Sequence, residues 1–221
     1  MKPIIKALIH VRAGSQRVKN KNIKPFADST LLEIKINQLL KVPEIDAVVV
    51  NSESDEMLEI AKNLGAEIVK RTPYFASSTV PMNEVHQNMA ENMDCDIVVC
   101  TPVTAPLVKV ETISKMIKIY LENRDTYDSL NTGHYVKEFL WENNKPINYD
   151  PAKTPRSQDL PDIMALNFAV NIIAKEDYLK ARNVVGLKPN VVPIEKEEAI
   201  DIDDEIDFIF AEFMYKKIRM D

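Results

Sequence analysis

Strand and helix signals alternate along the first half of the sequence, and this alternation restricts the fold more than any other feature. Short apolar, β-branched runs typical of buried strands are each followed by a stretch with helical spacing. The expected strands are 4–11, 46–52, 66–70 and 96–102, and the expected helices are 29–42, 54–65, 83–93 and 109–123. A repeated β-α order of this kind predicts an α/β fold with a mostly parallel sheet and helices on both faces.

The second half has a different pattern and predicts a β-rich insertion. Two segments look like antiparallel strands joined by turns, and a proline-punctuated loop leads from them to a long apolar strand. These segments are 127–136, 139–150, 151–162 and 163–174. No linker divides the chain, so we expect a single domain over residues 1–221, in which about 127–175 project as an insertion.

A short helix at 175–182, a strand at 190–194 and a final helix complete the predicted elements. In the final helix, four apolar residues at helical spacing predict a face packed on the core, namely Ile206, Ile209, Phe210 and Phe213. Phe139 and Trp141 in the insertion are expected to pack in a core or in a dimer contact.

The overall charge limits the kinds of ligand. The 221 residues include 28 Lys and Arg against 34 Asp and Glu, a formal net charge of −6. Affinity for nucleic acid depends largely on cations that contact phosphate, so we expect no nucleic-acid partner and only a local polyanion site. The apolar runs are short for a membrane helix, and we expect neither a membrane span nor an export signal. Cys95 and Cys100 are interpreted as small core thiols, which fits a cytoplasmic protein.

A basic loop directly follows the first expected strand. Five cations occur between residues 12 and 24 with no acid among them, and they are Arg12, Arg17, Lys19, Lys21 and Lys24. Backbone N–H groups in the turn Ala13, Gly14, Ser15, together with these cations, can bind a di- or triphosphate. Ligands of parallel sheets bind at the carboxyl ends of strands, so loops 71–82 and 101–106 should meet this loop at one edge. The order of residues is not that of a Walker P-loop, and a solvated surface turn is the alternative.

An acidic segment near the end of the sequence is a second candidate site. In "IDIDDEID" (200–207), the alternation of Ile and Asp resembles an extended strand with Asp201 and Asp203 on one side, roughly 7 Å apart. Two such carboxylates can bind Mg²⁺, or Mn²⁺ in its place, beside substrate phosphates. The alternative is an N-terminal helix cap, which explains Asp204 and Asp207 but not the two preceding aspartates.

A polar loop before the long strand is a third candidate. Arg156, Gln158 and Asn167 could contact a polar substrate, although read alone they describe only a polar loop. His10 falls within the first expected strand and is interpreted as a core histidine, because no histidine has Cys or carboxylate neighbours at metal-ligand spacing.

Several motifs together resemble the acylneuraminate cytidylyltransferases, or CMP-sialic acid synthetases, and their nonulosonate relatives. "VRAGSQRVKNKN" is similar to that family's A-R-x-G-S-K-R-x-x-x-K-N, and "AIDIDDEIDFIFAE" to its I-D-I-D-x-x-x-D-F-x-x-A-E. Weaker similarities at "KRTPYFA", "TPVTAPL" and "RSQDLP" keep the family's order. The resemblance implies a Rossmann-like, GT-A-like nucleotidyltransferase fold and a homodimer in which the insertion is exchanged between subunits.

The resemblance also implies a reaction. The anomeric hydroxyl of a nine-carbon 2-keto sugar acid attacks the α-phosphate of CTP, which yields the CMP-sugar and pyrophosphate. Arg12 and Lys21 would be catalytic, and Asp201 and Asp203 would hold Mg²⁺. The residues implied to bind CTP are Ala13, Gly14, Ser15, Arg17, Asn22 and Arg71. Those implied to face the sugar are Arg156, Gln158 and Asn167.

Departures from the family pattern leave two alternatives open. Gln16 replaces a common lysine, and Ser78 replaces an aspartate. Phe168 and Asn171 stand where the family has glycine and tyrosine, and Lys109 lies near the place of an arginine that is missing here. The alternatives are a KDO-type or other sugar nucleotidyltransferase, and a homologue that binds nucleotide or sugar without turnover.

Overall fold

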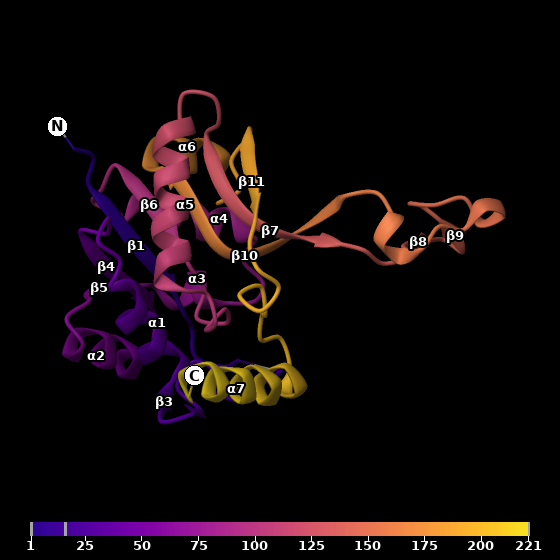
Figure 1. The fold of residues 1–221 in the computed structure, drawn as a ribbon. Helices are drawn as coiled ribbons and strands as arrows, with labels where there is room; N and C mark the ends of the chain where they lie inside the picture. Colours follow the sequence, from indigo (N-terminus) through magenta and orange to yellow (C-terminus); the bar gives the residue numbers. More distant parts are fainter. Residues whose placement is uncertain (1, 16, 221) are drawn as a thin grey trace.

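The central sheet is mostly parallel, as the sequence predicts. A computed structural model describes residues 2–15 and 17–220, and in this part of the chain seven strands form the main sheet in the order β11-β7-β10-β6-β1-β4-β5 (Figure 1). Their bounds are Pro189–Pro193, Ser129–Val136, Ile163–Ala174, Ile97–Cys100, Ile5–His10, Ala47–Ser52 and Glu67–Lys70. β10 is antiparallel to both neighbours, whereas β1 pairs with β4 and β6 in parallel.

Helices cover both faces of this sheet. α1, α2, α5 and α7 contribute to one apolar core, and α4 and α6 contribute to the other (Figure 1). The helices are α1 Leu31–Leu39, α2 Asp55–Asn63, α3 Pro73–Ala76, α4 Met82–Glu91, α5 Val110–Asn123, α6 Lys175–Ala181 and α7 Glu205–Met220. Successive side chains of β1 point to opposite faces, so Ala7 and Ile9 enter the first core and Leu8 enters the second. Across the described residues, none of the helices combines the length and the apolar character that a membrane crossing requires.

Local signals set the helix ends. The expected helix begins at Ser29, but α1 begins at Leu31, because Thr30 is the N-cap and its hydroxyl accepts from the backbone N–H of Glu33 at 3.2 Å. A two-stranded ribbon, β2 (Pro25–Phe26) with β3 (Ser29–Thr30), precedes this helix and explains the difference. α2 has Ser54 as its N-cap, and Gly65 follows it with a φ of +86°, the left-handed conformation that glycine adopts readily.

The predicted insertion is wrong in its bounds. β7 and β10, which flank it, belong to the main sheet, and only the segment that joins them projects, as an arm formed by residues 137–162 (Figure 1). The arm holds a small hairpin, β8 (Trp141–Glu142) with β9 (Lys145–Pro146), and two short 3₁₀ turns, Pro151–Lys153 and Ser157–Asp159. Asn143 and Asn144 both have positive φ, as a two-residue hairpin turn requires.

Side chains at the end of the arm do not pack in a core of this chain. Phe139 and Trp141 are 41% and 55% exposed, and the Phe139 ring meets only the edge of Tyr149, with centroids 4.9 Å apart. Of the two expectations for these residues, packing in a core of this chain is therefore wrong, and a dimer contact stays a prediction.

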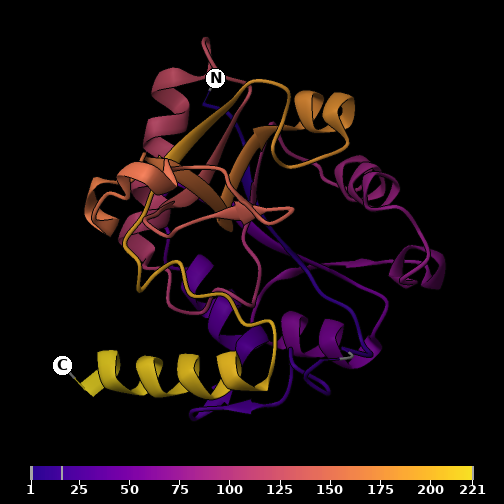
Figure 2. The same cartoon turned by 90° about the vertical axis from the view of Figure 1, so that its right-hand side faces the viewer.

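α7 packs on the molecule with a different face from the one expected. Ile206, Ile209, Phe210 and Phe213 are 51–77% exposed, whereas Phe208 and Ala211 are buried. The Phe208 ring packs edge-on against Phe26, with centroids 5.2 Å apart. α7 carries apolar residues around most of its circumference, so its spacing alone could not identify the buried stripe. The helix itself lies along the lower part of the molecule, below the arm in the view of Figure 2.

Candidate active site

Four loops meet at the carboxyl ends of β1, β4 and β6. Arg12 donates from Nη1 to the carbonyl of Ala76 at 2.9 Å, which joins the basic loop to the loop that contains α3. The backbone N–H of Ile202 donates to the carbonyl of Thr104 at 3.0 Å, which joins the acidic segment to the loop after β6. Lys21 donates from Nζ to the carbonyl of Ile202 at 2.6 Å, which joins the basic loop to the acidic segment. Basic, acidic and polar loops therefore share one edge of the sheet.

The basic loop has a defined backbone. Gly14 has a φ of +75°, which a side chain would strain, and Ser15 beside it is half-buried. Asn22 is buried, and its Nδ2 donates to the carbonyl of Arg12 at 3.0 Å, so it holds the two ends of the loop together. Gln16, which stands where the family motif has a common lysine, lies outside the described residues.

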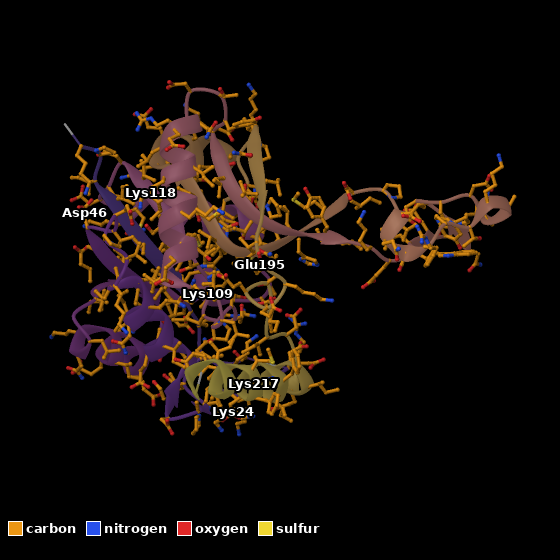
Figure 3. All side chains as sticks on the ribbon, viewed as in Figure 1. Lys24, Asp46, Lys109, Lys118, Glu195 and Lys217 are labelled. Atoms are coloured by element: carbon orange, nitrogen blue, oxygen red, sulfur yellow. The ribbon has the colours of Figure 1, made fainter. Side chains whose placement is uncertain are left out.

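Cations of the basic loop meet the acidic segment directly. Arg17 Nη2 lies 2.7 Å from Asp203 Oδ1. Lys24, labelled beside α7 in Figure 3, has its Nζ 2.8 Å from Glu205 Oε2 at the start of that helix. Desolvation lowers the pKa of Lys21, and the carboxylates of Asp201 and Asp203 offset part of that effect. The positive and negative halves of the predicted site are thus side by side, although about 180 residues separate them in sequence.

The carboxylates of the acidic segment fall into two groups. Asp204 and Asp207 cap α7, since Asp204 Oδ1 accepts from the N–H of Ile206 at 2.8 Å and Asp207 Oδ2 accepts from the N–H of Asp203 at 2.9 Å. Desolvation raises the pKa of Asp201, a hydrogen bond from Thr104 lowers it, and the nearby charge of Asp203 raises it again. The capping explanation therefore covers the later aspartates but not Asp201 and Asp203, and the contact of Asp203 with Arg17 would have to open for a ligand to bind there.

A pocket of about 320 Å³ opens beside the basic loop. Arg12, Arg71 and Ser78 line it, together with Val11 just after β1 and apolar residues of α3 and α4. Arg71 is buried, and its guanidinium donates to the carbonyl of Val11 and lies 3.2 Å from Glu53 Oε2. The Nε of Arg71 is also buried and has no hydrogen-bond partner among the described residues, so one donor remains for a ligand.

Glu53 is a site residue that the sequence reasoning missed. Its Oε1 accepts from the backbone N–H of Ala13 at 2.7 Å, while its Oε2 pairs with Arg71. One carboxylate therefore holds the turn of the basic loop against the first pocket. A carboxylate directly after the second strand could have drawn attention to it, because that strand ends at the same edge of the sheet.

A second pocket, of about 340 Å³, lies between β1, β6 and β10. Asn167 and Asp201 both line it, and His10 lines this pocket as well as the first. The interpretation of His10 as a core histidine is wrong, because the residue is half-buried and faces both pockets; its Nδ1 is 3.6 Å from Cys100 Sγ. Desolvation lowers the pKa of His10 to about 4. The alternation of β1 could not show that its last residue reaches beyond the core.

The remaining predicted residues lie elsewhere. Arg156 and Gln158 are exposed on the arm, where Arg156 Nε lies 2.8 Å from Asp159 Oδ2, and neither lines one of the two pockets. Lys109 Nζ is 3.7 Å from the buried Glu198, which ties it to the segment before Asp201.

Among the described residues, no group of three or more His, Cys, Asp and Glu side chains could hold a metal ion alone.

The mostly parallel sheet with helices on both faces defines a Rossmann-like fold. The chain is similar in fold to a CMP:2-keto-3-deoxy-manno-octonic acid synthetase complexed with CTP, with a TM-score of 0.73 over 97% of this chain and 99% of that one, at 9% sequence identity. A match at this level of identity shows the shared fold.

The chain belongs to the cytidylyltransferase family, whose model matches residues 6–199. It is 26% identical to a pseudaminic acid cytidylyltransferase of Campylobacter jejuni over 220 residues, which cover 95% of each chain. It is 24% identical to N-acylneuraminate cytidylyltransferase A of Danio rerio, where the match covers 94% of this chain and 50% of the relative. The class of enzyme implied by the opening and closing motifs is therefore confirmed.

Proposed function

We propose that the protein activates an acidic nine-carbon sugar with CTP and releases pyrophosphate. The observation that carries this proposal is the meeting of Lys21 and Arg17 with the Asp201–Asp203 segment, between two pockets. One pocket has a buried arginine with a free donor, and the other adjoins a carboxylate. Such a site can neutralise a triphosphate and align a second substrate with it. The names of the two relatives, a pseudaminic acid and an N-acylneuraminate cytidylyltransferase, support an acidic nonulosonate as that substrate.

The first pocket suits the nucleoside end of CTP. The Nε of Arg71 can donate to the base or the ribose, and Asn22 keeps the neighbouring backbone in place. Ala13, Gly14 and Ser15 then face the phosphates with their N–H groups, once the Ala13 N–H leaves Glu53. Arg12, Arg17 and Lys21 neutralise the phosphate charge that develops on the leaving pyrophosphate.

The reaction itself needs little covalent chemistry from the protein. The oxygen of the sugar hydroxyl bonds to the α-phosphorus, the bond from that phosphorus to its bridging oxygen breaks, and pyrophosphate leaves as the hydroxyl proton is released. Holding the two substrates in line supplies much of the acceleration. Asp201, which lines the second pocket, borders the place where the hydroxyl would approach.

Asp201 and Asp203 fit a Mg²⁺ ion, and Mn²⁺ has the same preference for carboxylate oxygens. Burial, and to a smaller extent the charge of Asp203, raises the pKa of Asp201, and a divalent cation would offset both effects. Two carboxylates without a third protein ligand suit Mg²⁺, which keeps waters and shares substrate phosphates. When bound, the ion would shield phosphate charge and lower the pKa of the sugar hydroxyl.

A homodimer would bring the arm into this scheme. Arg156 and Gln158 face solvent on the arm, whose aromatic side chains are also exposed, so a second copy of the chain could receive them. Light scattering after size exclusion should then give twice the mass of one chain. Mixing Arg156→Ala with Asp203→Asn protein should restore about a quarter of wild-type activity if arms act on the partner's site, and none if each arm serves its own chain.

A pyrophosphate-release assay tests the proposed function. CTP, Mg²⁺ and a panel of nonulosonic acids should give turnover, and EDTA should abolish it. Turnover with the eight-carbon KDO alone, or with another nucleotide in place of CTP, would establish the KDO-type or other transferase instead. Magnesium-dependent binding of CTP without turnover on any sugar would establish a homologue that only binds. A cytoplasmic location remains a prediction, which cell fractionation checks.

A further inference from the structure

Phe168 has a backbone conformation that ordinarily selects glycine. Its φ is +55°, in the left-handed region where a side chain is strained. It lies where the pairing of β10 with β7 shifts register between Leu166 and Asn171, so it forms part of a bulge. Bulges with a left-handed residue usually place glycine there.

Neighbouring side chains fix this bulge on both sides. Asn171 Nδ2 donates to the carbonyl of Phe168 at 2.8 Å and to that of Cys100 at 3.2 Å. Asn167 Oδ1 accepts from the N–H of Ala169 at 3.1 Å and from Thr132 Oγ1 at 2.7 Å. The conformation is therefore imposed by buried hydrogen bonds, and the phenyl ring has to tolerate it.

The ring of Phe168 forms part of the wall of the second pocket and remains 43% exposed. A large apolar side chain that is strained and partly exposed contributes little to the stability of the fold. Strained residues of this kind concentrate at ligand sites. The position of the ring indicates that a ligand covers it.

The lining of the second pocket defines what can cover the ring. Asp201 is the one charged residue among its lining side chains, and no Lys or Arg is present. His10 and His86 are neutral at neutral pH, because desolvation lowers the pKa of both. None of the lining side chains is a cationic partner for an anionic carboxylate, and a Mg²⁺ ion on Asp201 would face the phosphates, so the rest of the pocket suits an uncharged part of a substrate.

One polar atom of the pocket lining still needs a partner. Asn167 Nδ2 is buried and has no hydrogen-bond acceptor among the described residues. A buried N–H group without an acceptor destabilises the protein until a ligand oxygen reaches it. An acylamino substituent supplies both groups that the pocket lacks. Its carbonyl oxygen can accept from Asn167 Nδ2, and its alkyl group can pack on the ring of Phe168.

We propose that Phe168 determines sugar specificity by packing against the acyl group of an acylamino substituent whose carbonyl accepts from Asn167. This inference rests on the proposed cytidylyl transfer and names the part of the sugar that the second pocket recognises. The acidic group of the sugar is then held outside this pocket.

Steady-state kinetics with two acid sugars tests the proposal. One sugar carries an N-acetyl group, and the other carries a hydroxyl in its place. Phe168→Ala and Phe168→Gly should each raise the KM for the N-acetyl sugar about five- to tenfold, the loss expected for one apolar contact. The KM for CTP and that for the hydroxyl analogue should change less than twofold.

Comparing the two variants separates the ring from the backbone. Both lose the ring, but only alanine keeps the strain, so Phe168→Gly should melt about 2 °C above Phe168→Ala, against the usual order of alanine and glycine. Leu187→Ala, which shortens another exposed apolar side chain away from both pockets, is the control and should leave all KM values unchanged.

The outcomes distinguish the inference from the function on which it rests. No CTP-dependent turnover with either sugar would overturn the proposed function. Turnover in which Phe168→Ala raises the KM equally for both sugars, or for neither, would overturn the role of Phe168 and leave the proposed function standing.

Discussion

Lys35 is a fully buried lysine whose charge should make the stability of the protein depend on pH. It lies on the inner face of α1 and is 0% exposed. Its Nζ donates to Gln38 Oε1 at 2.6 Å and to the carbonyl of Ala105 at 2.7 Å. Ala105 follows Thr104, whose carbonyl accepts from the acidic segment at Ile202. We predict that Lys35→Met removes a specific pH dependence of unfolding.

The magnitude follows from the pKa of this group. Desolvation lowers the pKa of Lys35 from 10.5 to about 7. Between these two values the unfolded chain binds a proton that the folded protein does not, so the free energy of unfolding rises with pH in this window. Below about pH 7 both states are protonated and the charged lysine destabilises the fold fully. Integration predicts that this one group adds about 2 kcal/mol to the free energy of unfolding between pH 7 and pH 9.

Urea denaturation at pH 7, 8 and 9 measures the effect. The free energy of unfolding of the wild type minus that of Lys35→Met should increase by about 2 kcal/mol across the series, because other titrating groups cancel in the difference. Lys41→Met, at an exposed position just after α1, controls for the loss of a lysine. A difference that stays constant with pH would refute the reasoning and show that the Lys35 amine is protonated throughout, held by its two oxygen acceptors.

Three further predictions concern separate parts of the molecule. Lys21→Met should lower kcat about 10²-fold or more with an unchanged circular dichroism spectrum, since its ammonium is replaced beside the phosphates; an equal loss of helix signal would contradict this. Phe26→Ala should destabilise the protein by about 3–5 kcal/mol in urea, because the ring is buried between Phe208 and Tyr215 of α7, and a loss below 1 kcal/mol would show that α7 docks without it. Thr30→Ala should lower the unfolding free energy by about 1 kcal/mol through loss of the α1 cap, whereas Ser29→Ala, one residue before the cap, should have a smaller effect.

The alternation of strands and helices could be predicted from sequence because each buried strand is a short apolar run and each helix keeps its own period. The meeting of the basic loop with the acidic segment was predicted from a resemblance, and the hydrogen bond from Lys21 to Ile202 places the two together. Periodicity carries no information about a contact between residues so far apart in sequence.

Other features depended on tertiary context. α7 has apolar residues on two sides, and only the position of Phe26 determines that Phe208 is buried and Phe213 is exposed. The strain at Phe168 arises from a register shift between strands that no local pattern marks. Glu53 gains its role from Arg71, which arrives from a different strand.

The ion pair between Arg17 and Asp203 also has a consequence for how the protein is made. The two residues are 186 positions apart, and Lys24 and Glu205 repeat the separation at 181. A ribosome adds about 5–20 residues per second, so the basic loop is synthesised on the order of ten seconds or more before its acidic partners exist. During that interval Arg17 and Lys24 lack the carboxylates of Asp203 and Glu205, so the basic loop is open to other anions. The order of translation therefore leaves the basic loop exposed first, and the docking of the acidic segment and α7 covers it.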